Sequence, residues 1–301
     1  MGTEEFSREM LAEAARLGAD VVASFSLRRE WAAKFPEWRD TSDVARAHAI
    51  EHHEVASIRS PEVLARLEAL KPDALLVMGL PQLITPAMLA TARLGAVATH
   101  PSVLPRNRGL NAVPWHLLHG ETEGGLSIFP ISKGLDDGPI LAQRRFPITL
   151  ADNARKLYDR VIAAGRELLP VALDAIETGR LAGAPQDERL ATYLPKHLPD
   201  RRIDWMLNAR RIYDLVRAMT VPYAGAYAWL GNRRMIVWDA GFSHEPVVAR
   251  PGEIVKITPR GVEVVTGAGI VVLRHIQLGE TIEPADEVFD RERMHIGAVL
   301  P

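Results

Sequence analysis

About the first hundred residues alternate short apolar runs with amphipathic helical stretches, and this rhythm restricts the fold more than any other feature of the chain. The apolar runs of strand length are residues 20–25, 50–55, 73–78 and 94–99. The helical patterns around them are residues 7–17, 61–70 and 86–93. Strands that alternate with helices predict a doubly wound, parallel α/β sheet of Rossmann-like type. Ligands bind such sheets at the carboxyl ends of strands, so His100, which ends the last run, marks a candidate site.

The pattern changes in the last third of the chain. Before the change, the predicted elements are residues 112–119 (helix), 126–131 and 140–146 (strands) and 152–178 (long helix). After it, a helix precedes five short strands that Gly and Asn turns separate, which is typical of a small β-barrel. These elements are residues 208–219, 225–230, 234–239, 253–257, 262–265 and 270–275. We therefore predict an α/β domain over residues 1–182, a linker over 183–200, and a β-barrel domain with a charged tail over 201–301.

Composition excludes several classes of protein. The chain has no cysteine, so disulfides, thiolate nucleophiles and Cys-ligated metals are excluded, and no metal is expected. No apolar run reaches the roughly 18 residues of a membrane span, and the N-terminal stretch has no signal-peptide core, so we expect a cytoplasmic protein. The formal net charge of -2 gives no overall attraction to nucleic acid. Arg28, Arg29 and Lys34 are expected to form a solvated loop face.

Two loops carry the residue types that proton transfer needs. The first begins at His100-Pro101-Ser102, and the second contains Asp136 within Leu-Asp-Asp-Gly-Pro. Either loop alone is weak support for a site. A histidine that ends a strand is more often structural than catalytic, and an Asp-Gly loop can be a simple β-turn. The two loops together are more informative than either one.

Together the loops resemble the motifs of the 10-formyltetrahydrofolate-dependent formyltransferases, the family that includes methionyl-tRNA formyltransferase. Those motifs are Asn-x-His-Pro-Ser-(Leu)-Leu-Pro and Leu-Asp-x-Gly, and their Asn, His and Asp form a catalytic trio. His100 and Asp136 match two members, whereas the Asn position is Ala98. The resemblance covers nearly the whole chain, and residues 191–196 and 202–205 match the family's junction into an OB-like C-terminal domain.

The resemblance implies transfer of a formyl group from N10-formyltetrahydrofolate, the co-substrate, to an amine. His100 would act as acid, base and oxyanion donor, and Asp136 would orient it. Ala98 has no donor to offer, and loss of one oxyanion donor typically costs about 10²–10³ in rate. Activity would therefore be reduced unless another donor replaces the Asn, with Asn107 and Asn111 as candidates. A non-catalytic, folate-binding relative is the competing interpretation.

The resemblance also implies two sets of binding residues. The folate would lie against the backbone of two loops, and the residues implied there are Leu83, Ile84, Leu89, Gly134, Leu135, Asp137 and Gly138. The amine acceptor would lie against residues that follow the His100 motif. These are Arg106, Asn107, Arg108, Gly109 and Trp115.

Two features favour a small amine, such as an amino sugar on a nucleotide carrier, over initiator methionyl-tRNA. Asn107 and Trp115 resemble the branch of the family that acts on small amines, because the tRNA-acting branch usually has an aromatic residue before its Arg-Gly. Residues 201–301 contain 13 Lys and Arg and 12 Asp and Glu, a net charge of about +1, which predicts weak attraction to tRNA. Methionyl-tRNA stays the alternative acceptor. The oligomeric state is open, with a dimer as one option.

Residues 1–6, Met-Gly-Thr-Glu-Glu-Phe, resemble the loop that follows the first strand in the family, commonly Met-Gly-Thr-Pro-Glu-Phe. That strand would lie upstream. It is central in a doubly wound sheet, so its loss would leave unpaired backbone in the core. We therefore expect a fold that lacks its N-terminal strand here. A trimmed chain or a displaced start codon accounts for this better than a natural fold without the strand.

Overall fold

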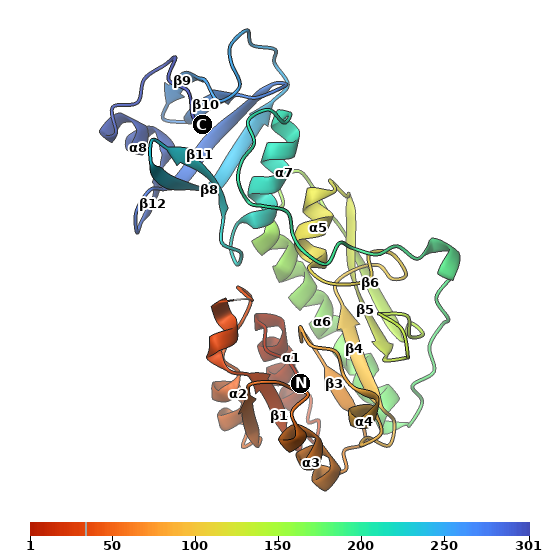
Figure 1. Cartoon of the computed structure of the whole chain (residues 1–301). Coiled ribbons are helices and arrows are strands. Elements are labelled where there is room, and N and C mark those ends of the chain that lie inside the picture. The colour runs from red at the N-terminus through yellow and green to blue at the C-terminus, as the bar shows by residue number, and fades with distance from the viewer. Residues whose placement is uncertain (34) are drawn as a thin grey trace. The chain divides into compact units, whose positions relative to one another are not determined.

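The computed structural model describes residues 1–33 and 35–301, so Lys34 lies outside the described residues (Figure 1). The chain divides into two compact units. The first comprises Met1–Ala112, Thr122–Ile148 and Tyr158–His197, and the second comprises Val113–Glu121, Thr149–Leu157 and Leu198–Pro301. None of the helices described is long and apolar enough to cross a membrane.

Two parallel strand pairs organise the first unit. β1 (Ser24–Leu27) pairs with β2 (His52–Val55), and β3 (Leu75–Val77) pairs with β4 (Ala96–His100). The segments around the strands form α1 (Glu5–Arg16), η1 (Arg29–Ala33), α2 (Ser42–Ala47), α3 (Pro61–Leu70) and α4 (Pro86–Leu89). Pro61 and Pro86 each stand in the first helical turn, where a missing N–H costs nothing. The Rossmann-like alternation is thus confirmed.

The sheet of β3 and β4 is mixed, although a parallel sheet was expected. β5 (Glu123–Pro130) runs antiparallel to β4, and β6 (Ala142–Pro147) runs antiparallel to β5. The connection from β5 to β6 contains no helix. A short connection of this kind joins antiparallel neighbours, whereas parallel neighbours need a longer crossover. The order β3-β4-β5-β6 places β4, and therefore His100, inside the sheet.

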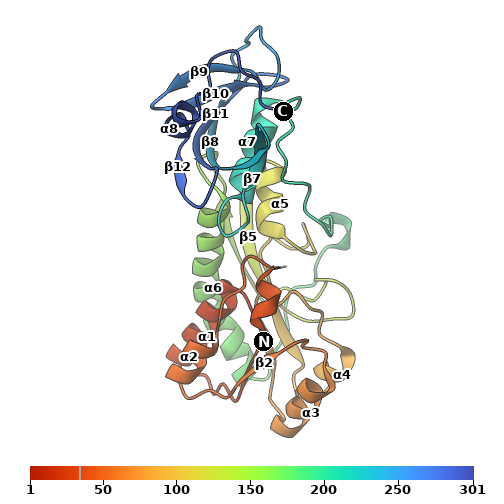
Figure 2. The ribbon, with the colours of Figure 1, turned by 60° about the vertical axis from the view of Figure 1, so that its left-hand side comes forward.

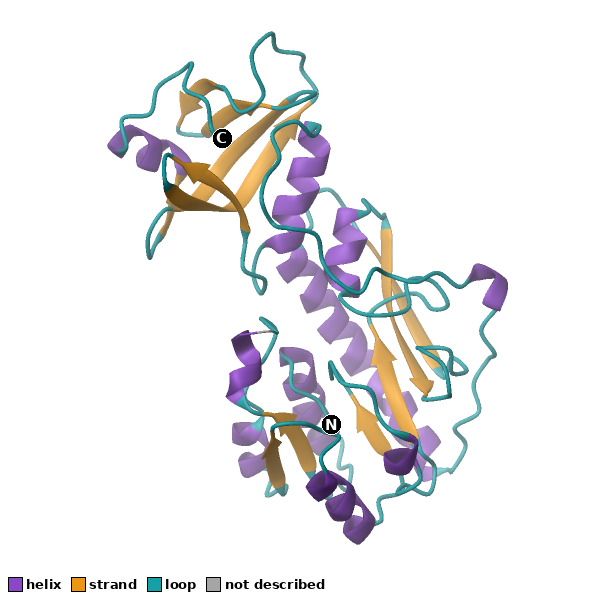
Figure 3. Cartoon of the chain, viewed as in Figure 1, coloured by secondary structure: helices purple, strands orange, loops and turns teal. Residues whose placement is uncertain are grey.

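Helices α1 and α6 (Ala154–Glu177) lie side by side in the first unit, as Figures 2 and 3 show. Gly165 of α6 makes this packing possible. A Cβ atom there would stand 2.6 Å from Phe6 Cε2 and 2.8 Å from Met10 Sδ, both on α1. Any larger residue would push the two helices apart, because cores have no spare volume for an added methyl group.

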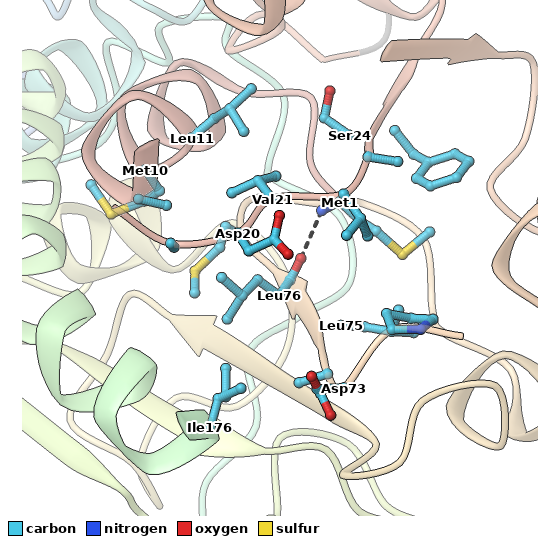
Figure 4. Close-up of a pocket in the computed structure, with 18 of the residues that line it drawn as sticks. Met1, Met10, Leu11, Asp20, Val21, Ser24, Asp73, Leu75, Leu76 and Ile176 are labelled. Atoms are coloured by element: carbon cyan, nitrogen blue, oxygen red, sulfur yellow. Dashed lines mark hydrogen bonds between the residues drawn. The ribbon is translucent and has the colours of Figure 1, made fainter. Parts of the chain in front are cut away.

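A groove separates the two strand pairs of the first unit. The first two residues bond to both pairs: Met1 N donates to Leu76 O at 2.7 Å and Gly2 N donates to Phe25 O at 3.1 Å. Beside Met1 the groove opens into a cavity of about 400 Å³ (Figure 4).

The second unit is built on an antiparallel sheet. Its strands are β7 (Ala226–Leu230), β8 (Arg233–Ser243), β9 (Ile254–Thr258), β10 (Gly261–Val265), β11 (Ile270–Gln277) and β12 (Ile282–Pro284). The order is β7-β8-β11-β10-β9, with β12 on β11, and this antiparallel sheet stands where the small OB-like domain was predicted. Helix α7 (Ala209–Met219) packs on this sheet, and α5 (Ala112–Leu118) lies mostly in the same unit.

The end of the chain is folded, although a charged tail was expected. Residues 285–291 form α8 (Ala285–Arg291), whose Val288 and Phe289 are buried in the core of the second unit. Leu300 is buried in the same core. The charged residues occupy the exposed side of a short helix, and a few apolar residues are enough to anchor it because they complete an existing core.

A buried ion pair fixes α7 within the second unit. Asp214 accepts hydrogen bonds from Arg217 Nε and Arg210 Nε, both at 2.7 Å, and the Arg217 side chain is only 4% exposed. Arg217 Nη1 also donates to the carbonyl oxygens of Thr149 and Asp152 at 3.1 Å and 3.0 Å. The guanidinium therefore satisfies two backbone acceptors besides the carboxylate.

Replacing this guanidinium tests its contribution to stability. We expect Arg217→Ala to lower the free energy of unfolding by about 3–5 kcal/mol, because it leaves a buried carboxylate with fewer partners. Urea denaturation of the two proteins gives the difference. Arg211→Ala, at an exposed position of the same helix, should change stability by about 0.5 kcal/mol or less. A loss below about 1 kcal/mol for Arg217→Ala would mean that the pair behaves like a surface ion pair.

Candidate active site

Strand β4 delivers His100 to the carboxyl edge of the sheet, where its side chain is 7% exposed. His100 Nε2 lies 2.6 Å from Asn107 O. A carbonyl oxygen can only accept, so Nε2 carries a proton. The other ring nitrogen, Nδ1, faces Asp136 Oδ2 at 3.7 Å, slightly beyond hydrogen-bond distance. A proton that arrives on Nδ1 is therefore stabilised by the carboxylate beside it.

Asp136 reaches His100 from a tightly folded loop. Its φ angle is 51°, in the left-handed region that Asp tolerates better than most residues. Its Oδ2 accepts a hydrogen bond from Gly109 N at 2.8 Å, so the carboxylate joins the two predicted loops. Gly138 permits the fold of this loop, because a Cβ there would stand 1.8 Å from Pro130 O. The structure thus brings His100 and Asp136 together, as predicted.

Ala98 lies two residues before His100 on β4, so both side chains are on the same face of the strand. Ala98 pairs with Val77 on one side and Phe129 on the other, and it is 8% exposed. Its methyl group supplies no hydrogen-bond donor to that face. Asn107 does lie beside His100, through its backbone oxygen, with a φ of 59°.

Two polar residues of the neighbouring strands hold the loop after His100. Ser127 of β5 donates to Ser102 O at 2.7 Å and accepts from Leu104 N at 3.2 Å. Gln143 of β6 donates to Ser127 Oγ at 2.9 Å. Sequence analysis missed both residues. A serine inside the otherwise apolar run of β5 was the one signal that could have indicated Ser127.

Arg108 is buried and fully engaged within the first unit, with its side chain 1% exposed. Its guanidinium donates to Glu188 at 2.6 Å and 3.0 Å, to Gln186 Oε1 at 2.8 Å and to Tyr193 OH at 3.1 Å. The Glu188 carboxylate raises the pKa of Arg108 above its usual value, and Arg108 lowers the pKa of Glu188. This geometry favours a structural role for Arg108 over contact with an acceptor.

Gln186 links this guanidinium to the Asp136 loop. Its Nε2 donates to Asp136 O at 2.8 Å and to Gly138 O at 2.7 Å, while its Oε1 faces Arg108. Because Arg108 can only donate, the amide of Gln186 has one orientation that satisfies both ends. Sequence analysis missed Gln186, which it placed in a linker.

The segment around η2 (Glu188–Leu190) also pairs with the loop after His100. Arg108 N donates to Thr192 O and Leu194 N donates to Arg108 O, both at 2.9 Å. Asn107 N donates to Thr192 Oγ1 at 2.9 Å. Residues up to His197 accordingly belong to the first compact unit. The segment predicted as a linker is part of the wall of the site.

The predicted folate-binding residues lie on two loops of the first unit. Leu83 and Leu135 are exposed apolar side chains, and Ile84 and Leu89 are half-buried. A Cβ on Gly109 would stand 3.9 Å from Leu135 Cδ2, so the loop of Leu135 lies against the loop after His100. Contact of these residues with folate stays a prediction.

Asp137 and Gly134 hydrogen-bond to each other and so stabilise the conformation of their own loop. Asp137 Oδ1 accepts from Gly134 N at 3.2 Å and from the Ser132 hydroxyl. A folate contact at Asp137 or Gly134 would therefore fall to backbone atoms, as the resemblance implies.

The predicted acceptor-binding residues have different environments. Arg106 is exposed and Asn107 half-buried on the loop after His100, where both are accessible. Trp115 lies on α5 in the second unit and packs against His119, with ring centroids 5.0 Å apart and the two rings tilted by 35°. Contact of these residues with an acceptor stays a prediction.

Comparison with known proteins identifies the family of this chain. A family model described as "Formyl transferase" matches residues 2–173, and one described as "Formyl transferase, C-terminal domain" matches residues 198–293. The methionyl-tRNA formyltransferase of Geotalea uraniireducens is 31% identical over 303 residues, which are 100% of this chain and 93% of that protein.

Two solved structures show the same fold. The N-formyltransferase of Helicobacter canadensis, in complex with folinic acid and dTDP-3-aminofucose, is 14% identical with a TM-score of 0.63, over 90% of this chain and 96% of that chain. HypX of Aquifex aeolicus, in complex with tetrahydrofolic acid, is 22% identical with a TM-score of 0.61, over 82% of this chain and 43% of that chain. The two family models and the 31% identical relative show that the chain belongs to the folate-dependent formyl transferase family, whose enzymes take their formyl group from N10-formyltetrahydrofolate.

Proposed function

We propose that this formyltransferase formylates the amine of initiator methionyl-tRNA. The observation that carries the proposal is similarity over the full length of the chain. Six curated relatives, 29% to 32% identical over 92% to 100% of this chain, are methionyl-tRNA formyltransferases. The match includes the second unit, so it does not depend on the catalytic loops alone. This reverses the preference for a small amine that the sequence analysis reached.

His100 and Asp136 supply the proton transfers that the reaction needs. The amine must be neutral when it attacks the formyl carbon, and it must lose a proton afterwards. His100 Nε2–H is bonded to Asn107 O, so Nδ1 is the nitrogen that takes up this proton. The imidazolium then lies 3.7 Å from the Asp136 carboxylate, which stabilises its charge. His100 returns the proton to the leaving nitrogen.

This site is least well equipped to stabilise the oxyanion that forms on the formyl group. Such a charge needs donors that are already oriented toward it, and Ala98 provides none. The His100 ring can donate from Nδ1 only after it has taken up the amine proton, because Nε2–H is bonded to Asn107 O. We therefore propose an enzyme whose chemical step is slow because one donor is missing.

Restoring the missing donor tests this account of Ala98. Ala98→Asn should raise kcat by about 10²–10³ and leave the affinity for a folate analogue nearly unchanged, because the oxyanion exists only along the reaction path. Thr99→Asn is the matched control, since Thr99 is the next residue of β4 and faces the opposite side. Steady-state kinetics and folate titration give both readouts. An active parent with no gain from Ala98→Asn would mean that another donor has replaced the amide.

A small amine, such as an amino sugar on a nucleotide carrier, is the second candidate acceptor. The near-neutral charge of residues 201–301 and Asn107 beside the catalytic histidine favour it. Competition between the two acceptors is therefore the decisive assay.

We expect formyl transfer to initiator methionyl-tRNA, with kcat/KM falling as salt rises from 50 to 200 mM, each phosphate contact contributing roughly one unit of log–log slope. A panel of nucleotide-linked amino sugars, assayed with the same formyl donor, should give no turnover. Turnover of an amino sugar without turnover of the tRNA would overturn the tRNA proposal and retain the formyltransferase assignment.

A further inference from the structure

Three side chains with metal-binding atoms meet beside β2, in the first unit. His52 and Glu54 are two residues apart on this strand, so their side chains lie on the same face. Asp40 joins them from the segment between η1 and α2. One ring nitrogen of His52 and one carboxylate oxygen from each acidic residue all lie within 4.8 Å of one another. Within the described part of the chain, no other three His, Asp or Glu side chains meet in this way.

Two serines of β1 hold the ring of His52. The parallel register places Ser24 opposite His52 and Ser26 opposite Glu54. Ser24 Oγ lies 2.7 Å from His52 Nδ1, and Ser26 Oγ lies 3.3 Å from His52 Nε2. A hydroxyl group can accept or donate, so a serine can satisfy whichever ring nitrogen carries the proton while the other nitrogen keeps its lone pair. Partners of this kind orient the ligating imidazole in metal sites.

The segment that carries Asp40 is fixed on the other side of the cluster. Trp38 Nε1 donates to Leu27 O of β1 at 2.9 Å, and Arg39 N donates to Thr3 O at 3.0 Å. These bonds immediately precede Asp40 along the chain. The carboxylate is therefore held near β2 by its backbone, and its approach to His52 does not depend on a long flexible side chain.

The protonation states of the cluster suit a cation. Burial lowers the pKa of His52 and outweighs the nearby carboxylates of Glu54 and Asp40, which act to raise it, so the ring is neutral near pH 7. The N–H and hydroxyl of Ser42 lower the pKa of Asp40, and Ser42 N donates to its Oδ1 at 2.8 Å. Neutral imidazole and ionised carboxylate are the forms that bind metal ions.

The two carboxylates of the cluster have no cationic partner among the described residues. Asp40 and Glu54 form no salt bridge with a lysine or arginine there, whereas nearby Asp43 pairs with Arg8 and Glu51 pairs with Arg66. Two carboxylates so close together repel each other when both are ionised. One divalent cation would cancel both charges.

We propose that Asp40, His52 and Glu54 bind a divalent transition-metal ion, for which Zn²⁺ is the best fit. Zn²⁺ accepts nitrogen and oxygen ligands, and three protein ligands leave one tetrahedral position for water. Mg²⁺ and Ca²⁺ prefer sites built from oxygen atoms alone. No metal was expected from the sequence, which has no cysteine, but these three ligands need none. The ion would fasten the segment before α2 to β2.

This inference does not depend on the acceptor or on the chemistry of formyl transfer. Zinc chloride titration of the full, chelator-treated chain tests it by calorimetry. The ligand variants are Glu54→Gln and His52→Gln, which keep a side chain of similar reach. His53→Gln is the matched control, because His53 is the next residue of β2 and lies on the opposite face, where its ring stacks on Phe25.

The parent and the control should bind Zn²⁺ equally well at one tight site. Each ligand variant should weaken that binding by about 100-fold or more, since even the loss of a residue behind a metal ligand typically costs 10–100-fold. Zn²⁺ at about 100 times its Kd should also raise the Tm of the parent by about 5 °C, and it should not do so for the ligand variants.

Equal Zn²⁺ affinity in the parent and the ligand variants would overturn the proposal, as would a parent that does not bind Zn²⁺. Displacement of Zn²⁺ by an equal concentration of Mg²⁺ would also contradict it, because that result indicates unspecific attraction to acidic groups. If a change on β2 unfolds the protein, Asp40→Asn, in an exposed segment, provides the same readout with the same two outcomes.

Discussion

The buried guanidinium of Arg108 is the interaction on which the candidate site depends. A buried charge is tolerated only when its donors are satisfied, and Arg108 meets this demand with Glu188, Gln186 and Tyr193. Gln186 in turn holds the backbone of the Asp136 loop. The carboxylate that faces His100 is therefore positioned by residues some eighty positions away from Arg108 along the chain. The residues proposed for proton transfer lie in two short motifs, and the geometry of these motifs depends on a third segment.

Much of the fold could be predicted because the signals are local. Apolar runs and helical periodicity predicted β1 to β4 and the helices α1, α3 and α4, whereas α2 was missed. Pro61 and Pro86 indicated where two of these helices begin. The antiparallel direction of β5 and the packed end of the chain could not be predicted in this way. Strand direction depends on the neighbour that a strand finds, and α8 is stable because Phe289 enters a core built by other segments.

The site residues that could be predicted are likewise those with a local signal in the sequence. His100 and Asp136 were predicted because both stand in motifs whose residue order is visible in the sequence, and the structure brings them within 3.7 Å. Ser127 and Gln186 were missed because their roles exist only through contacts between distant segments. Arg108 shows the converse, since a position in a motif predicted acceptor binding while its burial favours a structural role.

The most direct test of this account is formyl transfer by Asp136→Asn. The amide oxygen can still accept from Gly109 N, so the loop should keep its shape and a stable folate analogue should bind as in the parent. The lost charge no longer stabilises an imidazolium at His100, and kcat should fall by about 10²–10⁴. Unchanged kcat with intact folate binding would contradict the claim that the His100–Asp136 pair carries the proton transfers.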